Sequence, residues 1–189
     1  MFAGLSFTVA AGQALVVTGP NGAGKTSLLR TLAGLIRPAS GSVTMTGGDP
    51  ELSVAEHSHF QGHLEPVKPT LTVAENLEFW ARFLGGGNTA PSDAALQTVG
   101  LAALAAMPAG YLSAGQRRRL SMARLLAVAR PLWLLDEPTA TLDLAGQDRF
   151  RELMRMHLAG GGLIVAATHV PLGLPARQLA LADPAEIPA

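Results

Sequence analysis

The residues best suited to chemistry form a glycine-rich loop at positions 19–26, with the sequence Gly-Pro-Asn-Gly-Ala-Gly-Lys-Thr. Its glycines permit backbone conformations that point successive N–H groups inward, so that the main chain can surround an anion. A helix that follows such a loop adds the positive end of its dipole. The pattern predicts a site for the phosphates of ATP, with the Lys25 ammonium on the β and γ phosphates and the Thr26 hydroxyl on Mg²⁺. The residues expected around the phosphates are Gly19, Pro20, Asn21, Gly22, Ala23, Gly24, Lys25, Thr26 and Ser27.

A pair of carboxylates follows a second apolar run. Residues 132–135 read Leu-Trp-Leu-Leu, and Asp136 and Glu137 come directly after them. Ligands of open parallel sheets bind at the carboxyl ends of the strands, where these two side chains would emerge. We therefore expect Asp136 to hold Mg²⁺ through water and Glu137 to polarise the water that attacks the γ-phosphate. The alternative is an acidic strand end that caps a helix.

A third motif is Leu-Ser-Ala-Gly-Gln at residues 112–116. Ser113 followed three residues later by Gln116 is typical of a capping box, so by itself the segment predicts no more than the start of a helix. A capped helix start with small residues is also a ready site for an anion. The anion site is favoured here because the motif lies about twenty residues before the acidic pair.

Short apolar runs and helical spacings indicate the elements that position these motifs. Strands are expected at 14–18, 42–46, 132–135 and 163–167, and helices at 25–35, 72–84, 113–128 and 144–158, with short helices between 92 and 107. The polar stretch 49–69 is expected to be irregular, and the last fifteen residues to be loosely held. All-apolar strands that alternate with helices indicate a parallel sheet covered on both faces, with a helical subdomain at about 70–128 inserted between strands.

Taken together, the motifs resemble those of the ABC ATPases. Residues 19–26, 112–116 and 136–137 resemble the Walker A, signature and Walker B elements, in the family's order. Residues 140–143 resemble the D-loop, and His169 resembles the switch histidine. The resemblance covers nearly the whole chain. It implies an α/β P-loop NTPase fold with a RecA-like core, an inserted helical subdomain within a single domain of residues 1–189, and ATP hydrolysis.

The resemblance also implies a second copy of the chain. In the family two such domains form a head-to-tail dimer, and each ATP lies between the Walker A of one copy and the signature of the other. Ser113, Gly115 and Gln116 would then bind the nucleotide held by the opposite copy, and Asp143 would cross the interface. His169 would contact the γ-phosphate and the attacking water, acting in catalysis with Glu137 and Lys25.

Two features depart from the family pattern. The glutamine that the family places beside the Mg²⁺ site would fall at His63, whereas the nearby glutamine is Gln61. Either the loop is shifted, or His63 takes the glutamine's part in nucleotide binding, since an imidazole can accept a hydrogen bond from metal-bound water. The family's first strand, with an aromatic residue that stacks on adenine, has no evident counterpart before Leu5, and Phe2 is a weak substitute.

The composition bears on other functions. Lys plus Arg and Asp plus Glu each number 14, so no net field favours nucleic acid or an anionic membrane. The chain has no Cys, which excludes disulfides and thiolate metal sites. His57, His59 and His63 are not spaced as in a compact zinc site, and a mobile coupling loop is the favoured interpretation. No run approaches the roughly 20 apolar residues of a membrane span, and no signal peptide is evident, so membrane contact would need a partner.

Within the ABC ATPases, longer segments resemble the ATPase of cytochrome c maturation, the ATP-binding subunit of a haem exporter. These segments are residues 62–63, 65–80, 111–120, 130–138 and 167–172. A histidine in place of the loop glutamine is typical of that group. The resemblance implies a peripheral subunit on the cytoplasmic face of the bacterial inner membrane, bound to a polytopic membrane subunit. An ATPase subunit of another ABC transporter and a soluble or hydrolysis-deficient ABC protein are the alternatives.

Overall fold

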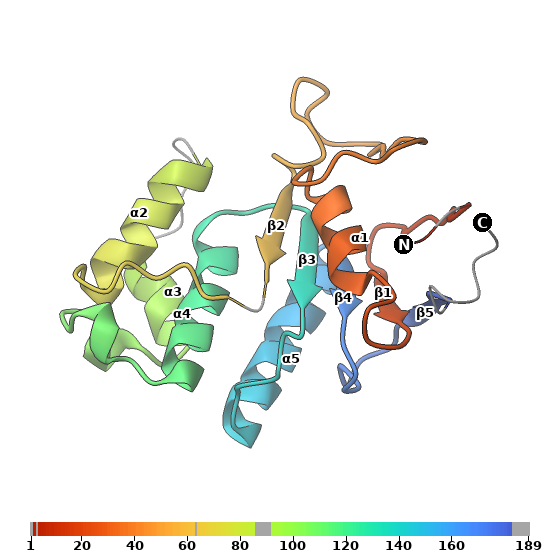
Figure 1. The fold of residues 1–189 in the computed structure, drawn as a ribbon. Coiled ribbons are helices and arrows are strands. Elements are labelled where there is room, and N and C mark those ends of the chain that lie inside the picture. Colours follow the sequence, from red (N-terminus) through yellow and green to blue (C-terminus); the bar gives the residue numbers. More distant parts are fainter. Residues whose placement is uncertain (1, 3, 63, 86–91, 183–189) are drawn as a thin grey trace. The chain divides into compact units, whose positions relative to one another are not determined.

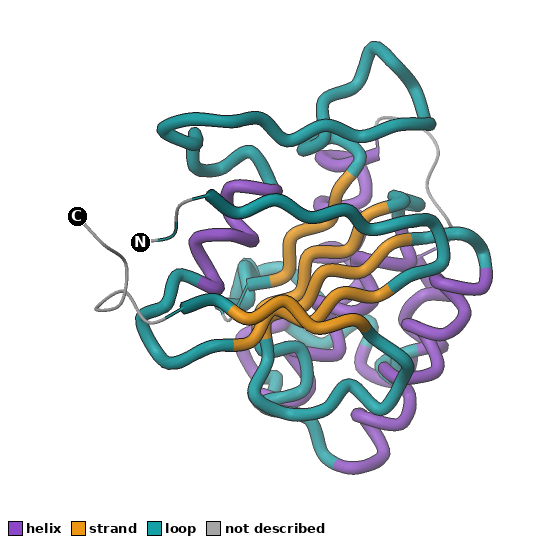
Figure 2. The backbone as a smooth tube through the Cα atoms, turned by 90° about the vertical axis from the view of Figure 1, so that its right-hand side faces the viewer, coloured by secondary structure: helices purple, strands orange, loops and turns teal. Residues whose placement is uncertain are grey.

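Three of the strands predicted from apolar runs lie in one parallel sheet, joined by two strands that the sequence did not reveal (Figure 1). The structure, a computed structural model, describes residues 2, 4–62, 64–85 and 92–182. The strand order is β2-β3-β4-β1-β5, and every neighbouring pair is parallel. Figure 2 shows the strands side by side in one sheet. The strands are β1 (Ala14–Thr18), β2 (Ser58–Gln61), β3 (Leu132–Asp136), β4 (Leu163–Ala167) and β5 (Arg177–Ala180). Parallel strands bring their carboxyl ends to one edge, where the loop after β1 and the carboxylates after β3 begin.

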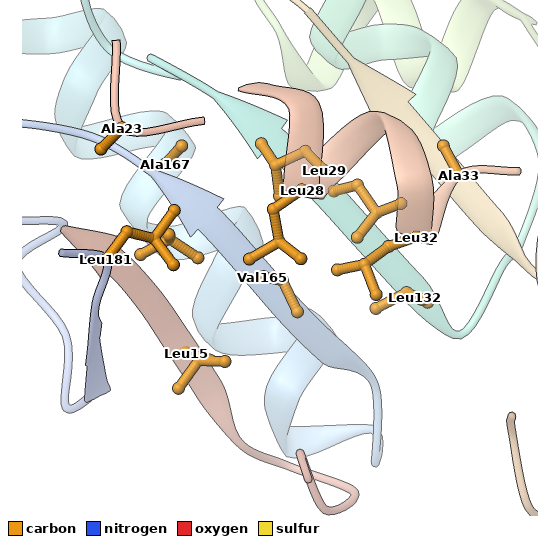
Figure 3. Close-up of a cluster of buried hydrophobic side chains, with 12 residues drawn as sticks. Leu15, Ala23, Leu28, Leu29, Leu32, Ala33, Leu132, Val165, Ala167 and Leu181 are labelled. Atoms are coloured by element: carbon orange, nitrogen blue, oxygen red, sulfur yellow. The ribbon is translucent and has the colours of Figure 1, made fainter. Parts of the chain in front are cut away.

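One face of the sheet is covered by α1 (Lys25–Leu32). The helix turns Leu28, Leu29 and Leu32 onto the sheet, where Leu132 and Val165 meet them (Figure 3). These side chains are buried, and each buried leucine contributes about 2 kcal/mol relative to an exposed one. This packing fixes the start of α1, and with it the end of the glycine-rich loop, against the carboxyl edge of the sheet.

The opposite face carries Trp133, which alternates with the leucines of β3 that face α1. The imidazole of His157, near the end of α5 (Leu144–Ala159), stacks on the Trp133 ring with centroids 3.9 Å apart. Its Nε2 donates to the carbonyl oxygens of Pro131 and Leu163, at 3.1 and 3.3 Å. Burial lowers the pKa of His157 below its ordinary 6.5, although the two carbonyls oppose this effect. The neutral ring is thus part of the packing on this face.

Three sequence predictions about this region are wrong. Residues 42–46 form no strand, because no neighbouring segment of the described chain pairs with them. The stretch 49–69 is not wholly irregular, since β2 lies within it and pairs with β3. The last fifteen residues include β5, which pairs with β1; residues 183–189 lie outside the described part.

A separate compact unit holds the helices that carry the third motif. The chain divides into residues 1–63, 130–138 and 154–189, which include the sheet, and residues 64–129 and 139–153. In the second unit α2 (Val73–Gly85) and α3 (Ser92–Thr98) pack against α4 (Ala114–Ala127), with short 3₁₀ turns at Ala102–Leu104 and Ala109–Tyr111. Its fully buried side chains include Leu77, Leu96, Leu101 and Met122. These helices begin and end close to the predicted positions, and the unit contains the range 70–128 predicted for the helical subdomain.

Candidate functional site

The loop after β1 has the backbone of an anion site. Gly19, Gly22 and Gly24 have φ angles of 141°, 86° and 98°, a region that other residues rarely adopt. A Cβ atom at Gly19 would lie 2.7 Å from the carbonyl oxygen of Leu181, so this position also excludes a side chain by close approach. Gly24 is the N-cap of α1. The loop therefore delivers its N–H groups and the start of a helix to the same place.

The Lys25 ammonium lies over this loop. Its Nζ donates to the carbonyl oxygens of Gly19 and Pro20, at 2.7 and 2.9 Å. Neutral carbonyls hold the ammonium without cancelling its charge. The arrangement places a positive charge beside the glycine-rich loop and the start of α1, which is the combination that a triphosphate requires.

Thr26 and Asp136 meet although 110 positions separate them in the chain. The Thr26 hydroxyl donates to Oδ2 of Asp136 at 2.9 Å, and the Asp136 side chain is buried. A hydroxyl and a carboxylate are oxygen ligands of the kind that Mg²⁺ prefers, and a nucleotide bound in the loop beside them would supply phosphate oxygens. The two side chains thus fit a Mg²⁺ site, with Asp136 acting directly or through a bound water.

Glu137 has an unusual backbone at the end of β3. Its φ is 45°, the only positive value for a residue other than glycine in the described chain. The main-chain N–H of Glu137 donates to the carbonyl oxygen of Ala167 at 2.8 Å, which ties this turn to the end of β4. Non-glycine residues in this conformation are strained and cluster at functional sites. The turn brings the carboxylate of Glu137 to the same sheet edge as Asp136.

Two residues after β4 face the Glu137 carboxylate. The Thr168 hydroxyl donates to Oε2 at 3.2 Å, and Nε2 of His169 lies 3.8 Å from Oε1. The separation between Nε2 of His169 and Oε1 of Glu137 exceeds a hydrogen bond, and a water molecule could contact both groups. The His169 side chain is 55% exposed and the Glu137 side chain 31%, so both can reach a substrate. A carboxylate and an imidazole that share access to one water are suited to general-base chemistry.

Thr168 is a site residue for which the sequence prediction gave no role. It is buried, and its hydroxyl accepts from the N–H of Val170 at 3.0 Å. The single hydroxyl proton can donate either to Glu137 or to the carbonyl oxygen of Val170 at 3.1 Å. Because β3 and β4 are in register with Asp136 opposite Ala167, the next residues on the two strands must be neighbours. Only this pairing, which the sequence does not reveal, places Thr168 beside Glu137.

The register of β2 bears on the loop glutamine. Gln61 pairs with Leu135, so its side chain points to the face of the sheet opposite to Asp136. It is buried, and neither side-chain atom has a hydrogen-bond partner among the described residues. Gln61 is therefore no ligand of the Thr26–Asp136 pair. His63, the other possibility, lies outside the described residues.

The third motif forms the capping box that its sequence predicts. The N–H of Gln116 donates to the Ser113 hydroxyl at 3.2 Å, and the N–H of Ser113 donates to Oε1 of Gln116 at 2.8 Å. Ser113 is exposed, so this start of α4 is open to solvent. A Cβ at Gly115 would lie 3.2 Å from the carbonyl oxygen of Thr141, in the loop before α5. These residues belong to the second compact unit.

Asp143 also belongs to the second unit and precedes α5. Its Oδ1 accepts from the N–H of Gly146 at 2.8 Å, which caps the helix. The side chain is exposed. Asp143 therefore caps α5 within this unit, and its exposed side chain can still contact another molecule.

Among the described residues of this region, His57 and His59 belong to no cluster that could hold a metal ion. His57 is buried, with Nδ1 donating to the carbonyl oxygen of Ser53 at 3.0 Å and Nε2 accepting from the N–H of Asp49 at 3.2 Å. Within the residues that the structure describes, no group of three or more His, Asp or Glu side chains could hold a metal ion. His57 thus stabilises a turn.

Comparison with known proteins agrees with these motifs. The sequence pattern of the family described as "ABC transporter" matches residues 2–140. The chain belongs to the ABC transporter family. It is 61% identical over 179 residues to the cytochrome c biogenesis ATP-binding export protein CcmA of Nitrobacter winogradskyi, with 95% of this chain and 89% of the relative covered. The CcmA protein of Rhodopseudomonas palustris is 60% identical over 181 residues, with the same coverage.

Solved structures of other ABC proteins share the fold of this ABC protein. The solved ATP-binding subunit of an ABC transporter superposes on it with a TM-score of 0.76 at 23% identity, covering 87% of this chain and 71% of that one. The predicted α/β P-loop fold and the ABC-type ATPase activity are thereby confirmed. In the described part of the chain, no helix has the length and apolar character of a membrane span.

Proposed function

We propose that this chain is the ATP-hydrolysing subunit of the haem exporter of cytochrome c biogenesis. Its relatives at 61% and 60% identity carry the name of the ATP-binding export protein of that process. The subunit would bind ATP and Mg²⁺ and act on the cytoplasmic face of the bacterial inner membrane. The observation that carries the ATPase assignment is the contact at 2.9 Å between Thr26 and Asp136, which unites the phosphate loop with the acidic strand end.

Nucleotide binding follows from the loop geometry. The inward amides of residues 19–26 and the start of α1 surround the β-phosphate, and Lys25 exchanges its carbonyl contacts for phosphate oxygens. Thr26 and Asp136 hold Mg²⁺, which when bound neutralises charge on the phosphates. His63, at the position of the family glutamine, is proposed to contact the nucleotide-binding region through a water.

The residues proposed to catalyse hydrolysis lie directly after β3 and β4. Glu137 accepts a hydrogen bond from the attacking water, while Thr168 fixes the second oxygen of its carboxylate at 3.2 Å. His169 holds the same water or the γ-phosphate from the other side. A carboxylate oriented in this way raises the nucleophilicity of water when the phosphoryl group becomes electron-poor in the transition state.

A second copy of the chain is proposed to complete each site. Ser113 lies exposed at the start of a 14-residue helix, with Gly115 and Gln116 behind it. An exposed helix N-terminus whose serine hydroxyl can donate its proton is suited to a γ-phosphate. Asp143, exposed before α5, would contact the opposite copy. Head-to-tail closure around two ATP molecules would then do work on a partner, and hydrolysis would reset it.

The second unit also presents a surface that suits a polytopic membrane subunit. The Phe83 side chain is 70% exposed and Phe79 is 38% exposed, with their rings stacked 6.2 Å apart on α2. They line a shallow groove together with Leu71, Glu75, Glu78 and Arg82. Exposed aromatic side chains rimmed by charges are typical of protein interfaces. We propose that a cytoplasmic helix of the membrane subunit occupies this groove.

The test is Glu137→Gln in the complex purified with its membrane subunit. Replacing the carboxylate by its neutral isostere should reduce turnover by about 100-fold or more. ATP affinity should stay within about twofold, and ATP should trap a closed dimer, detected by size-exclusion chromatography. Asp148→Asn, an exposed carboxylate on α5, is the matched control and should hydrolyse ATP normally. Unchanged turnover by Glu137→Gln would refute the assignment.

A further inference from the structure

The start of α4 carries positive charge and no carboxylate in its first turn. Arg117, Arg118 and Arg119 follow the capping box, and the first turn contains no acidic residue. The helices α2 and α3 of the same unit begin differently, with Glu75 in the first turn of α2 and Asp93 in that of α3. The amino end of a helix is electropositive, so cations placed there raise the energy unless an anion joins them. The charge pattern of α4 therefore favours an added anion.

Two of the three arginines have partners inside the unit. Arg118 is buried and donates to Oε1 of Glu65 at 2.6 Å, so a carboxylate neutralises its charge. Arg119 donates to the carbonyl oxygen of Gly100 at 3.4 Å, just beyond the end of α3. The carboxyl end of a helix is electronegative and favours a cation. Both guanidinium groups thus stabilise the packing of α4 within the unit.

Arg117, by contrast, lies back along the start of α4. Its Nη1 donates at 2.6 Å to the carbonyl oxygen of Leu112, the residue before Ser113. Helical side chains point towards the amino end of their helix, and residues four positions apart share a face, so Arg117 lies on the face of Ser113. Arg117 is partly exposed, and no carboxylate of the described residues lies within ion-pair distance of it. Its charge is therefore placed at the end of the helix that disfavours a cation.

The donors at this helix start are those that a phosphoryl group requires. The N–H groups of Ala114 and Gly115 have no acceptor among the described residues, because first-turn amides have no partner within their own helix. The Ser113 hydroxyl can donate its proton, and the bond to Leu112 uses one of the five N–H donors of Arg117. A planar guanidinium matches two oxygens of a phosphate, and its charge strengthens both bonds. These donors together suit the three oxygens of a terminal phosphate.

We infer that Arg117 is a further binding residue, whose guanidinium contacts the γ-phosphate of the ATP held by the opposite copy. The inference rests on the proposed function, because it needs a second copy of the chain. In the single chain the guanidinium is held on the Leu112 carbonyl, already on the face of Ser113. On closure it turns to the phosphate oxygens and adds a full charge to the partial charges of the helix start. Closure of the dimer then depends on a charged group that ATP carries and ADP lacks.

The experiment uses the complex with the membrane subunit in the Glu137→Gln background, where ATP traps the closed dimer. Arg117→Gln should raise the ATP concentration for half-maximal trapping about tenfold, the value of a hydrogen bond to a charged group. ATP affinity of the full chain without the membrane subunit should change less than about twofold, because the distant phosphate loop of the same copy is intact. Arg151→Gln, which removes a guanidinium paired with Asp148 on α5, is the control for loss of a positive charge.

The salt dependence separates a phosphate contact from a structural part of Arg117. Between about 50 mM and about 500 mM NaCl, trapping of the parent should weaken by a larger factor than trapping of Arg117→Gln, because salt screens the charge that the variant lacks. A role limited to holding the Leu112 carbonyl would leave this difference at zero. Arg117→Lys keeps the charge without the planar fork, so its half-maximal ATP concentration should rise only about threefold.

Trapping of Arg117→Gln at the ATP concentration of the parent, or the same salt dependence in both proteins, would overturn the inference alone. So would a matching loss of ATP affinity in the full chain without the membrane subunit, because Arg117 would then act on the site of its own copy. A parent complex that ATP does not trap would overturn the proposed second copy and the inference with it. If Arg117→Gln does not fold, Arg117→Lys carries the test, and an unchanged half-maximal ATP concentration in that variant would refute the inference.

Discussion

The two regions assigned to ATP differ in how much strain their backbone carries. The loop at 19–26 and the turn at Glu137 use positive φ angles, and Gly19 admits no side chain against Leu181. The start of α4 is relaxed, because Ser113 and Gln116 satisfy each other in an ordinary capping box. Strain persists only where surrounding structure enforces it. The loop is therefore a binding site preformed within one chain. In the proposed dimer, the start of α4 would bind phosphate only when the nucleotide of a second copy lies against it.

The largest expected effect comes from the charge in the strained region. Lys25→Ala should weaken ATP binding to the isolated subunit by about 100-fold or more, since it removes the ammonium beside the phosphates. Titration with a fluorescent ATP analogue measures this loss. Lys68→Ala is the matched control, because Lys68 is the other lysine of the chain and its ammonium lies 4.4 Å above the Phe79 ring. Equal affinities of the two variants would contradict the phosphate role of Lys25.

A smaller effect is expected at the relaxed helix start. Ser113→Ala removes a cap and should destabilise the protein by about 1 kcal/mol. Thr72→Ala removes the corresponding cap of α2, where the Thr72 hydroxyl accepts from the N–H of Glu75 at 3.1 Å. Both variants should melt at similar temperatures, but only Ser113→Ala should lose about tenfold in ATP turnover, the value of a hydrogen bond to a charged group.

This pair of variants separates capping from phosphate binding at one helix terminus. Turnover that falls equally in both would show that Ser113 acts through stability. Turnover that is normal in both would leave the start of α4 with only its structural part, and the two regions would then differ in function as well as in strain.

Thr168→Val tests how the strained turn is held. Valine keeps the shape of threonine but cannot donate to the Glu137 carboxylate, so kcat should fall about fivefold, which corresponds to a hydrogen bond of about 1 kcal/mol, with KM nearly unchanged. Thr98→Val, at an exposed site where the hydroxyl donates to the carbonyl oxygen of Ala94, is the control. A loss confined to KM would mean that Thr168 binds nucleotide instead of orienting the carboxylate.

The smallest effect is expected at the face of the sheet opposite to α1, where His157 packs on Trp133. Because the pKa of His157 is lowered in the folded protein, the unfolded chain takes up a proton more readily below pH 6.5. The free energy of unfolding therefore decreases as the pH is lowered. His157→Phe keeps a ring on Trp133 but does not titrate. Between about pH 7.5 and about pH 5.5, the melting temperature of the wild type should fall about 2–4 °C further than that of the variant. Parallel pH dependence in both proteins would exclude His157 as the cause.

A motif could be predicted from the sequence where all the residues that form it lie in one short segment. The glycines, Lys25 and the following helix lie within 14 positions, and the apolar run before Asp136 indicated its strand. β2 could not be predicted, because Ser58, His59 and Gln61 are polar residues that are buried only through pairing with β3. Residues 42–46 show the converse error, since a favourable local pattern formed no strand without a neighbour in the described chain.

The sequence by itself determined the phosphate loop, the acidic strand end, the capped helix start and the α/β class, because each depends on residues a few positions apart. The motifs also predicted that Thr26 and Asp136 would share a Mg²⁺ site. Only the tertiary structure decided that these two side chains touch directly, that Thr168 lies beside Glu137 and that Gln61 faces away from Asp136. These contacts depend on strand order and register, which join positions more than thirty residues apart. Such pairings arise from burial of the whole sheet, and no local pattern of residues encodes them.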